Sequence, residues 1–185
     1  MAQVMAFHLQ GISPHIFKNC GSLVNVHLSN GLKSIGSRSF EKCIKLEDLY
    51  IPDSVEHIGD GLCCGCTSLK SVHMPNGITE LGYEIFRDCK KLSKIYLPNA
   101  LMKIGARAFE NCCNLQSPWI PNGLTELGER AFVGCKSIRE IWIPESVIAI
   151  GEGAFDQCTG LIIKGKRGSL AEKYAKYNGF SFVPD

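Results

Sequence analysis

The stretch CKKLSKIYLPNALMKIGARAFENC, from Cys89 to Cys112, contains one complete period of the chain and the first residue of the next. It places three aliphatic residues before a proline, a second aliphatic pair before a glycine, then Ala-Phe and a new cysteine. The same order recurs from Ile12 to Ile150 without an insertion or deletion. A fixed period of about 20 to 50 residues is the signature of a repeat architecture.

Three kinds of residue keep a spacing of 23 positions. An aliphatic residue opens each register, a phenylalanine follows it after five positions, and a cysteine follows after eight, with Cys63 as the one exception among the phenylalanines. The aliphatic residues are Ile12, Ile35, Ile58, Leu81, Ile104, Leu127 and Ile150; the phenylalanines are Phe17, Phe40, Phe86, Phe109, Phe132 and Phe155; the cysteines are Cys20, Cys43, Cys66, Cys89, Cys112, Cys135 and Cys158. Seven such registers indicate stacked coils of equal length.

Within each coil the I-x-L triplet alternates between two faces, which predicts a strand of about three to four residues. Equivalent strands of successive coils then form a parallel sheet with a spacing of about 4.8 Å. The proline after the triplet ends the strand, and Asn-Gly pairs at 30–31, 76–77 and 122–123 favour turns there. The second aliphatic pair returns to the core, and the glycine after it permits close approach of the backbones. The sequence therefore predicts a right-handed solenoid with a parallel concave sheet.

The quoted stretch resembles the repeat of the BspA-like, or treponemal, class of leucine-rich repeats, whose consensus is close to C-x-x-L-x-x-I-x-L-P-x-x-L-x-x-I-G-x-x-A-F-x-x. The resemblance covers about residues 12–163. It implies a leucine-rich-repeat solenoid and a secreted or surface-exposed adhesin or interaction protein. Two residues depart from the pattern, since Cys63 replaces a phenylalanine and Pro118 stands where a strand aliphatic belongs. We expect Pro118 to loosen the pairing of its strand.

The period divides the chain into a partial N-terminal repeat at 1–11, a solenoid of seven registers at 12–163 and a C-terminal cap at 164–185. In the cap, Ser169 and Glu172 form a capping box and Asn178-Gly179 supplies a helix stop, which predicts a short helix over the last coil. The partial repeat predicts an uncovered parallel edge, which is a route to self-association.

Charge and hydropathy argue against two kinds of partner. Lys and Arg total 20 against 18 Asp and Glu, and no segment gathers one sign, so we expect no nucleic-acid partner. No run approaches the roughly 18 apolar residues of a membrane span. The first residues, MAQVMAFHLQG, lack the features of a secretory signal. The expectation of a secreted or cell-surface protein therefore rests on the family resemblance, and a cytoplasmic or periplasmic location stays open.

The ten cysteines admit several interpretations. We favour small buried thiols that donate weakly to backbone carbonyls, one on each coil. Disulfides between neighbouring coils are geometrically allowed, but an odd ladder of identical thiols has no obvious pairing. A zinc site is disfavoured because the C-x-x-C of Cys63 and Cys66 has no second pair.

The sequence contains no catalytic constellation. The five histidines form no metal-ligand spacing, and a nucleophile elbow, a P-loop and a dinucleotide fingerprint are all absent. We therefore predict a protein that is not an enzyme and needs no cofactor or metal.

The outward residues of the I-x-L triplets are the candidate binding site. Both tryptophans of the chain fall in this set, which forms an aromatic column of roughly 25 to 30 Å along the concave face. Cross-strand ring pairs also stabilise sheets, so part of the pattern has a structural explanation. The aromatic column comprises His27, Tyr50, His73, Tyr96, Trp119 and Trp142, with Val4 and Ile162 expected at its two ends.

Three functions fit this column. The first is a non-catalytic binding or adhesion module for a protein partner such as a host-surface or matrix protein, with the aromatic residues as anchors. The second is binding of a small molecule or carbohydrate on the same column. The third is self-assembly into a homodimer through the column or the N-terminal edge.

Overall fold

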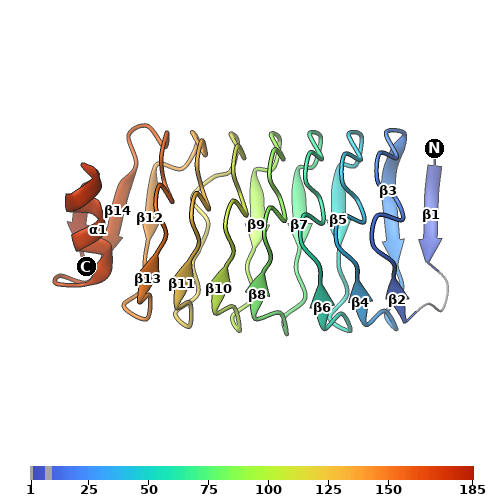
Figure 1. Cartoon of the computed structure of the whole chain (residues 1–185), viewed down its shortest axis with the longest axis horizontal. Helices are drawn as coiled ribbons and strands as arrows, with labels where there is room; N and C mark the ends of the chain where they lie inside the picture. Colours follow the sequence, from blue (N-terminus) through green and yellow to red (C-terminus); the bar gives the residue numbers. More distant parts are fainter. Residues whose placement is uncertain (1, 7–9) are drawn as a thin grey trace.

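The computed structural model describes residues 2–6 and 10–185, with side chains from residue 10 onward. The chain forms one row of stacked coils that runs from the partial turn of β1 to the helix α1 (Figure 1). Most coils contribute short strands to two faces, and the aliphatic, phenylalanine and cysteine residues fill the space between them. The predicted solenoid of 23-residue coils is confirmed.

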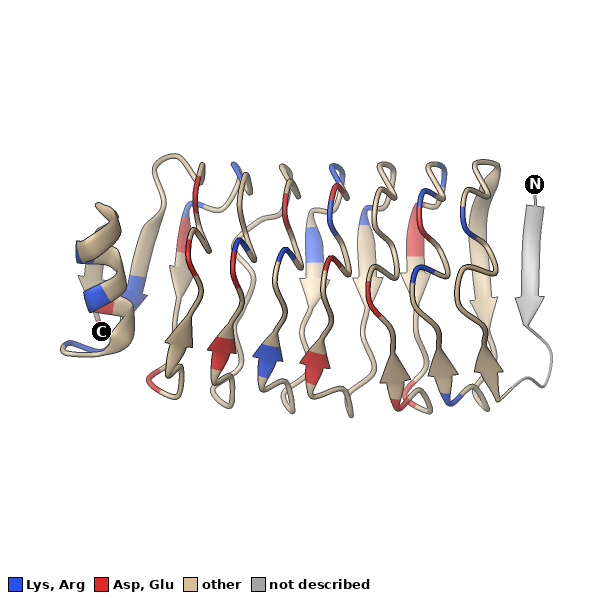
Figure 2. Ribbon diagram, in the orientation of Figure 1, with Lys and Arg blue, Asp and Glu red and all other residues tan. Residues whose placement is uncertain are grey.

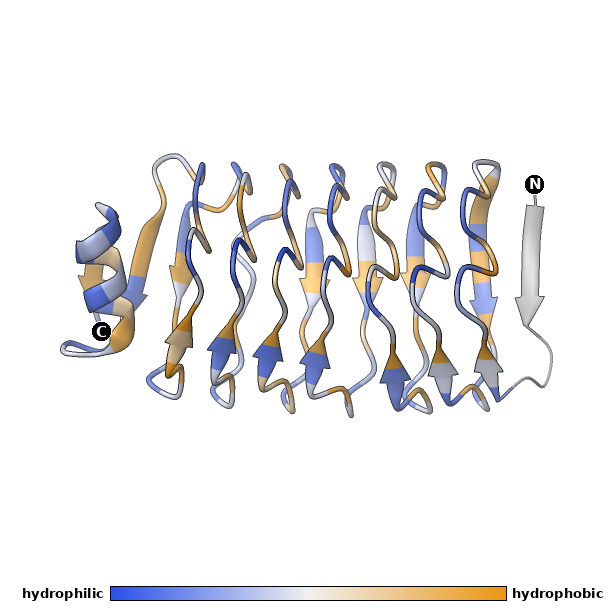
Figure 3. Ribbon diagram, in the orientation of Figure 1, coloured by the Kyte–Doolittle hydropathy of each residue, from blue (hydrophilic) through white to orange (hydrophobic). Residues whose placement is uncertain are grey.

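The first face contains the predicted I-x-L strands, all paired in parallel. Each of β5, β7 and β9 carries one hydrophobic band, which is its inward residue (Figure 3). The sheets on this face are β1–β3, β5–β7–β9 and β12–β14–β15. Their strands are β1 (Ala2–Ala6), β3 (Leu23–Leu28), β5 (Asp48–Tyr50), β7 (Ser71–His73), β9 (Lys94–Tyr96), β12 (Glu140–Trp142), β14 (Ile162–Gly165) and β15 (Ser181–Pro184).

Pro118 interrupts this face, as the sequence predicts. Residues 117–119 form no strand, and the sheet that ends at β9 does not continue to β12. A proline has no N–H to donate, so its coil cannot complete the ladder. Instead, the hydroxyl of Ser117 accepts a hydrogen bond from the backbone N–H of Glu140 at 3.3 Å.

The second face also forms parallel sheets, which the sequence analysis did not predict. The second aliphatic pair of each coil makes a two-residue strand, with the orders β2–β4–β6 and β8–β10–β11–β13. On its outer side Lys103 lies between Glu80 and Glu126, with N–O distances of 3.8 and 3.4 Å, and charges of both signs are interspersed along the coils (Figure 2). The strands are β2 (Gly11–Ile12), β4 (Ser34–Ile35), β6 (His57–Ile58), β8 (Glu80–Leu81), β10 (Lys103–Ile104), β11 (Glu126–Leu127) and β13 (Ala149–Ile150).

The C-terminal part covers the last coil with a helix and a further strand. The helix α1 (Leu170–Asn178) begins at Ser169, whose hydroxyl accepts from the N–H of Glu172, and ends at Gly179 in the left-handed conformation. Tyr174 is buried and meets the ring of Phe155 edge-on at 5.9 Å. The predicted capping helix is confirmed, and β15 adds a strand beside β14 that was not predicted.

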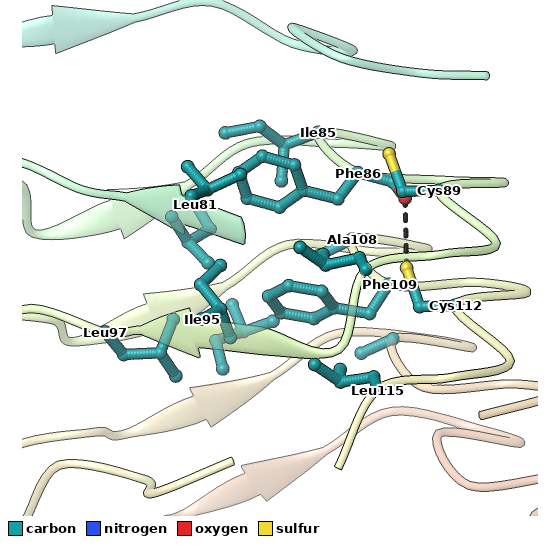
Figure 4. Packing of buried hydrophobic residues seen from close by; sticks show 14 of the residues in the cluster. Leu81, Ile85, Phe86, Cys89, Ile95, Leu97, Ala108, Phe109, Cys112 and Leu115 are labelled. Atoms are coloured by element: carbon teal, nitrogen blue, oxygen red, sulfur yellow. Dashed lines mark hydrogen bonds between the residues drawn. The ribbon is translucent and has the colours of Figure 1, made fainter. Parts of the chain in front are cut away.

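A row of phenylalanines forms the spine of the core, and Cys63 interrupts it. Ring centroids are 5.6 Å apart for Phe86 and Phe109, whose stacked arrangement is visible in Figure 4. In the coil of Cys63 the preceding residue is Leu62, which is fully buried; the equivalent residue is Ile85 beside Phe86 and Ala108 beside Phe109. We infer that Leu62 fills part of the volume that a ring at position 63 would have occupied.

A seam between β6 and β8 divides the second face. Elsewhere the glycine after the strand donates to the previous coil, as Gly105 does to Leu81 at 2.7 Å, but within the described residues Gly82 makes no such bond to Ile58. The carboxylate of Asp60 occupies this seam and accepts from the N–H of Tyr83 at 2.8 Å. A hollow of about 380 Å³ results at this point. We interpret Asp60 as a wedge that keeps the two coils from pairing.

Removal of this wedge should close the seam. In Asp60→Ala, β6 and β8 should pair, and amide hydrogen exchange at Thr79 and Gly82 should slow by about tenfold or more because both N–H groups gain acceptors. The matched control is Ser37→Ala on the previous coil, where β4 and β6 already pair. Unchanged exchange at both amides in Asp60→Ala would contradict the wedge.

The compensation at Leu62 predicts a non-additive pair of substitutions. Cys63→Phe alone should destabilise the fold by about 1 to 3 kcal/mol through overpacking, and adding Leu62→Ala should recover most of this loss. Urea unfolding of the wild type, the two single variants and the double variant measures the coupling. Strictly additive changes would show that the two side chains do not share this space.

Candidate binding surface

The residues of the aromatic column lie on the outer side of the first face. The register places Tyr50, His73 and Tyr96 side by side on β5, β7 and β9. Tyr50, Tyr96 and Trp119 are 56%, 67% and 56% exposed, although each stands between buried neighbours in the chain. The rings are open to solvent beside buried neighbours, which is the arrangement of an anchor residue at a binding surface.

The two ends of the column differ from the expectation. Trp142 pairs with Lys164 and not with Ile162. Lys164 follows Trp142 by 22 positions, which is one fewer than the 23-residue period. Ile162 instead pairs with Glu140. At the other end His27 pairs with Met5, not with Val4. The assignments of Ile162 and Val4 to the column were therefore wrong.

The column is not one continuous stack of rings. Tyr50 and His73 stack with centroids 4.7 Å apart and planes 10° from parallel. No other neighbours within the column stack among the side chains that the structure describes. The coil of Trp119 forms no strand, so the sheet beneath the column ends at Tyr96 and resumes at Trp142.

A cleft lies where Pro118 interrupts the face, and the sequence analysis did not identify it. One hollow of about 250 Å³ is lined by Tyr96, Pro118 and Trp119 together with Lys94. A second hollow of about 390 Å³ adjoins it and shares Ser93 and Gln116 with the first; its other lining residues are Asn114, Ser137 and Arg139. We call these two hollows the Pro118 cleft. The sign of the cleft in the sequence is Pro118 itself. The sequence does not show how much space the neighbouring coils leave around this residue.

The sequence model of the family described as BspA type leucine rich repeat region matches this chain at residues 4–116 and 38–162, in six copies. The chain belongs to this family. A leucine-rich repeat protein from Bacteroides ovatus is 25% identical with a TM-score of 0.78, and the match covers 99% of this chain and 54% of that one. The chain thus spans about half the length of that protein. None of the curated proteins matches the chain.

Two further solved structures are similar to this BspA-type chain. A leucine rich cell surface protein from Faecalibacterium prausnitzii is 25% identical with a TM-score of 0.56, covering 89% of this chain and 53% of that one. A leucine rich repeat protein from T. pallidum is 26% identical with a TM-score of 0.50, covering 88% and 62%. Among the described residues, no helix of this chain is long and apolar enough to cross a membrane.

The cysteine ladder of the BspA-type coils is a set of free thiols with structural roles. Six ladder thiols donate to a carbonyl of the previous coil, as Cys112 does to Phe86 at 3.1 Å (Figure 4). Burial raises the pKa of Cys43 to about 12 and that of Cys158 to about 11. Within the described residues no group of three or more His, Cys, Asp or Glu side chains is arranged to hold a metal ion. The interpretation as weakly donating buried thiols is confirmed for these six.

Cys20 is the exception, because it is exposed although the ladder was predicted to be buried. Among the described residues, no earlier coil with a ladder cysteine packs against the coil of Cys20. Cys113 lies outside the ladder and is half-buried. These two side chains are the accessible thiols of the BspA-type solenoid.

Thiol labelling tests this assignment. At pH 8 a chromogenic thiol reagent should react with Cys20 and Cys113 in the folded protein, while the buried thiols stay protonated and covered until unfolding. The double variant Cys20→Ser/Cys113→Ser should lose the fast reaction. As the control, all of its other thiols should still react once the protein is unfolded in denaturant. Rapid labelling of ladder thiols in the folded double variant would refute the assignment.

Proposed function

We propose that this chain is a non-catalytic binding module that holds an extended segment of a partner protein along the aromatic column. The observation that carries the proposal is the exposure of Tyr50, Tyr96 and Trp119, which occupy one position of the repeat and each stand between buried neighbours. Folded proteins seldom leave several large rings in one row open to solvent without a role in binding. Aromatic residues at the centre of an interface contribute most to affinity.

The shape and charge of the surface favour an extended protein segment. The column is one residue wide. One flank carries polar side chains of mixed charge, and the other carries the prolines that end the strands, such as Pro52, Pro98 and Pro121. Several of these charges are already paired, such as Lys70 with Glu47 at 2.8 Å and Lys164 with Glu140 at 2.6 Å. An apolar centre with a polar rim is the anatomy of a protein interface.

We further propose that the partner is a host-surface or matrix protein and that this chain acts outside the cell as an adhesin. The support is family membership and the similarity to a cell surface protein of Faecalibacterium prausnitzii. Repeat solenoids use their extended surfaces for binding, and function here resides in the outward residues, not in the fold.

Substitution of the tryptophans tests the proposal. The variant Trp119→Ala/Trp142→Ala should lose about 30-fold or more of its affinity for a partner protein, because the two anchors together contribute at least about 2 kcal/mol. Binding is measured by interferometry against a panel of immobilised, purified matrix and surface proteins, and circular dichroism reports the fold.

The matched control is Ile148→Ala/Tyr177→Ala, which removes two exposed apolar side chains outside the column. This control should bind as the wild type does. Equal binding by the tryptophan variant would overturn the proposal, and so would a wild-type protein that binds no member of the panel.

A further inference from the structure

We propose that the Pro118 cleft binds a carboxylate-bearing sugar, such as a uronic acid unit of a glycan. The inference goes beyond the proposed function, because it assigns a ligand of different chemistry to one segment of the aromatic column. The cleft has three properties that suit such a ligand: open rings, unpaired polar side chains and an uncompensated positive charge.

The rings of Tyr96 and Trp119 supply flat apolar platforms. Both are more than half exposed, and in the part of the chain that the structure describes they do not stack on each other. The face of an aromatic ring carries partial negative charge, and the C–H groups on one face of a pyranose ring carry partial positive charge. A sugar therefore has a favourable surface to lie against on either side of Pro118.

The adjoining hollow supplies hydrogen-bonding groups of the kind that hydroxyls require. Asn114, Gln116 and Ser137 line it, and their side chains make no hydrogen bond to any described residue. An amide both donates and accepts, as a sugar hydroxyl does. The hollow of about 390 Å³ lies near the low end of the range for small-ligand sites, and the hollow of about 250 Å³ beside it lies just below that range.

The charge of the cleft selects an anion. Lys94 and Arg139 line it, and no Asp or Glu does. Neither cation forms an ion pair with a described residue, although Arg139 donates to the carbonyl of Thr159 at 3.3 Å. The nearby carboxylate of Glu140 is held by Lys164 at 2.6 Å. A guanidinium binds a carboxylate through two parallel hydrogen bonds, so an acidic sugar complements the cleft better than a neutral one.

The test compares two probes that differ only in their carboxylate groups, which the second probe carries as neutral hydroxymethyl groups. Calorimetric titration uses a tetrasaccharide of alternating glucuronic acid and N-acetylglucosamine and its carboxyl-reduced, neutral counterpart. The wild type should bind the acidic probe about tenfold or more tightly. Lys94→Gln/Arg139→Gln should abolish this preference, and Trp119→Ala should weaken binding of both probes. The charge-matched control, Lys173→Gln/Lys176→Gln on α1, should keep the preference.

Three results would overturn the inference: equal affinity for both probes, no binding of either, or tighter binding of the acidic peptide Gly-Glu-Gly-Glu than of the acidic tetrasaccharide. Failure here is distinguishable from failure of the proposed function. If the sugar does not bind while partner binding still requires Trp119 and Trp142, only this inference falls. If the sugar binds while partner binding ignores both tryptophans, the proposed function falls.

Discussion

The structure depends on the close approach of successive backbones at the glycine that follows the second aliphatic pair. A Cβ atom on Gly151 would lie 2.2 Å from the backbone nitrogen of Glu129, and one on Gly128 would lie 2.4 Å from that of Ala106. This contact sets the distance between coils, at which the N–H of each of these glycines donates to the previous coil. No coil has a core of its own, so the stack buries apolar side chains only as long as this spacing is kept.

Each departure from the repeat therefore has a structural consequence on the neighbouring coil. Asp60 keeps Gly82 from the usual contact and leaves a seam, while Cys63 interrupts the row of rings. Pro118 interrupts the ladder under the aromatic column and leaves a cleft between Tyr96 and Trp119. Rigid coils on both sides hold the surface in place, so an irregular coil can provide a site without disturbing the fold.

Much of the fold could be predicted from the sequence because inward residues recur every 23 positions and strands alternate. The same period and alternation predicted the position of the aromatic column and the loss of strand pairing at Pro118. Strands such as Ser34–Ile35 were missed because two residues are too few to show alternation. The ends of the column were misassigned because the outermost strands depart from the period: Met5 pairs with His27 and Trp142 with Lys164, each pair 22 positions apart, and Ile162 was assigned from its aliphatic neighbours alone. The Pro118 cleft depends on side chains from three coils, which spacing alone does not bring together.

The central claim is that the aromatic column is a free surface for a partner of different sequence. Light scattering of the wild type beside Trp119→Ala/Trp142→Ala tests it most directly, because a second copy of the chain is the competing occupant of the column. The account predicts the mass of a single chain for both proteins. A wild-type dimer that becomes monomeric in the variant would contradict it, since the column would then be occupied by another copy of the same chain.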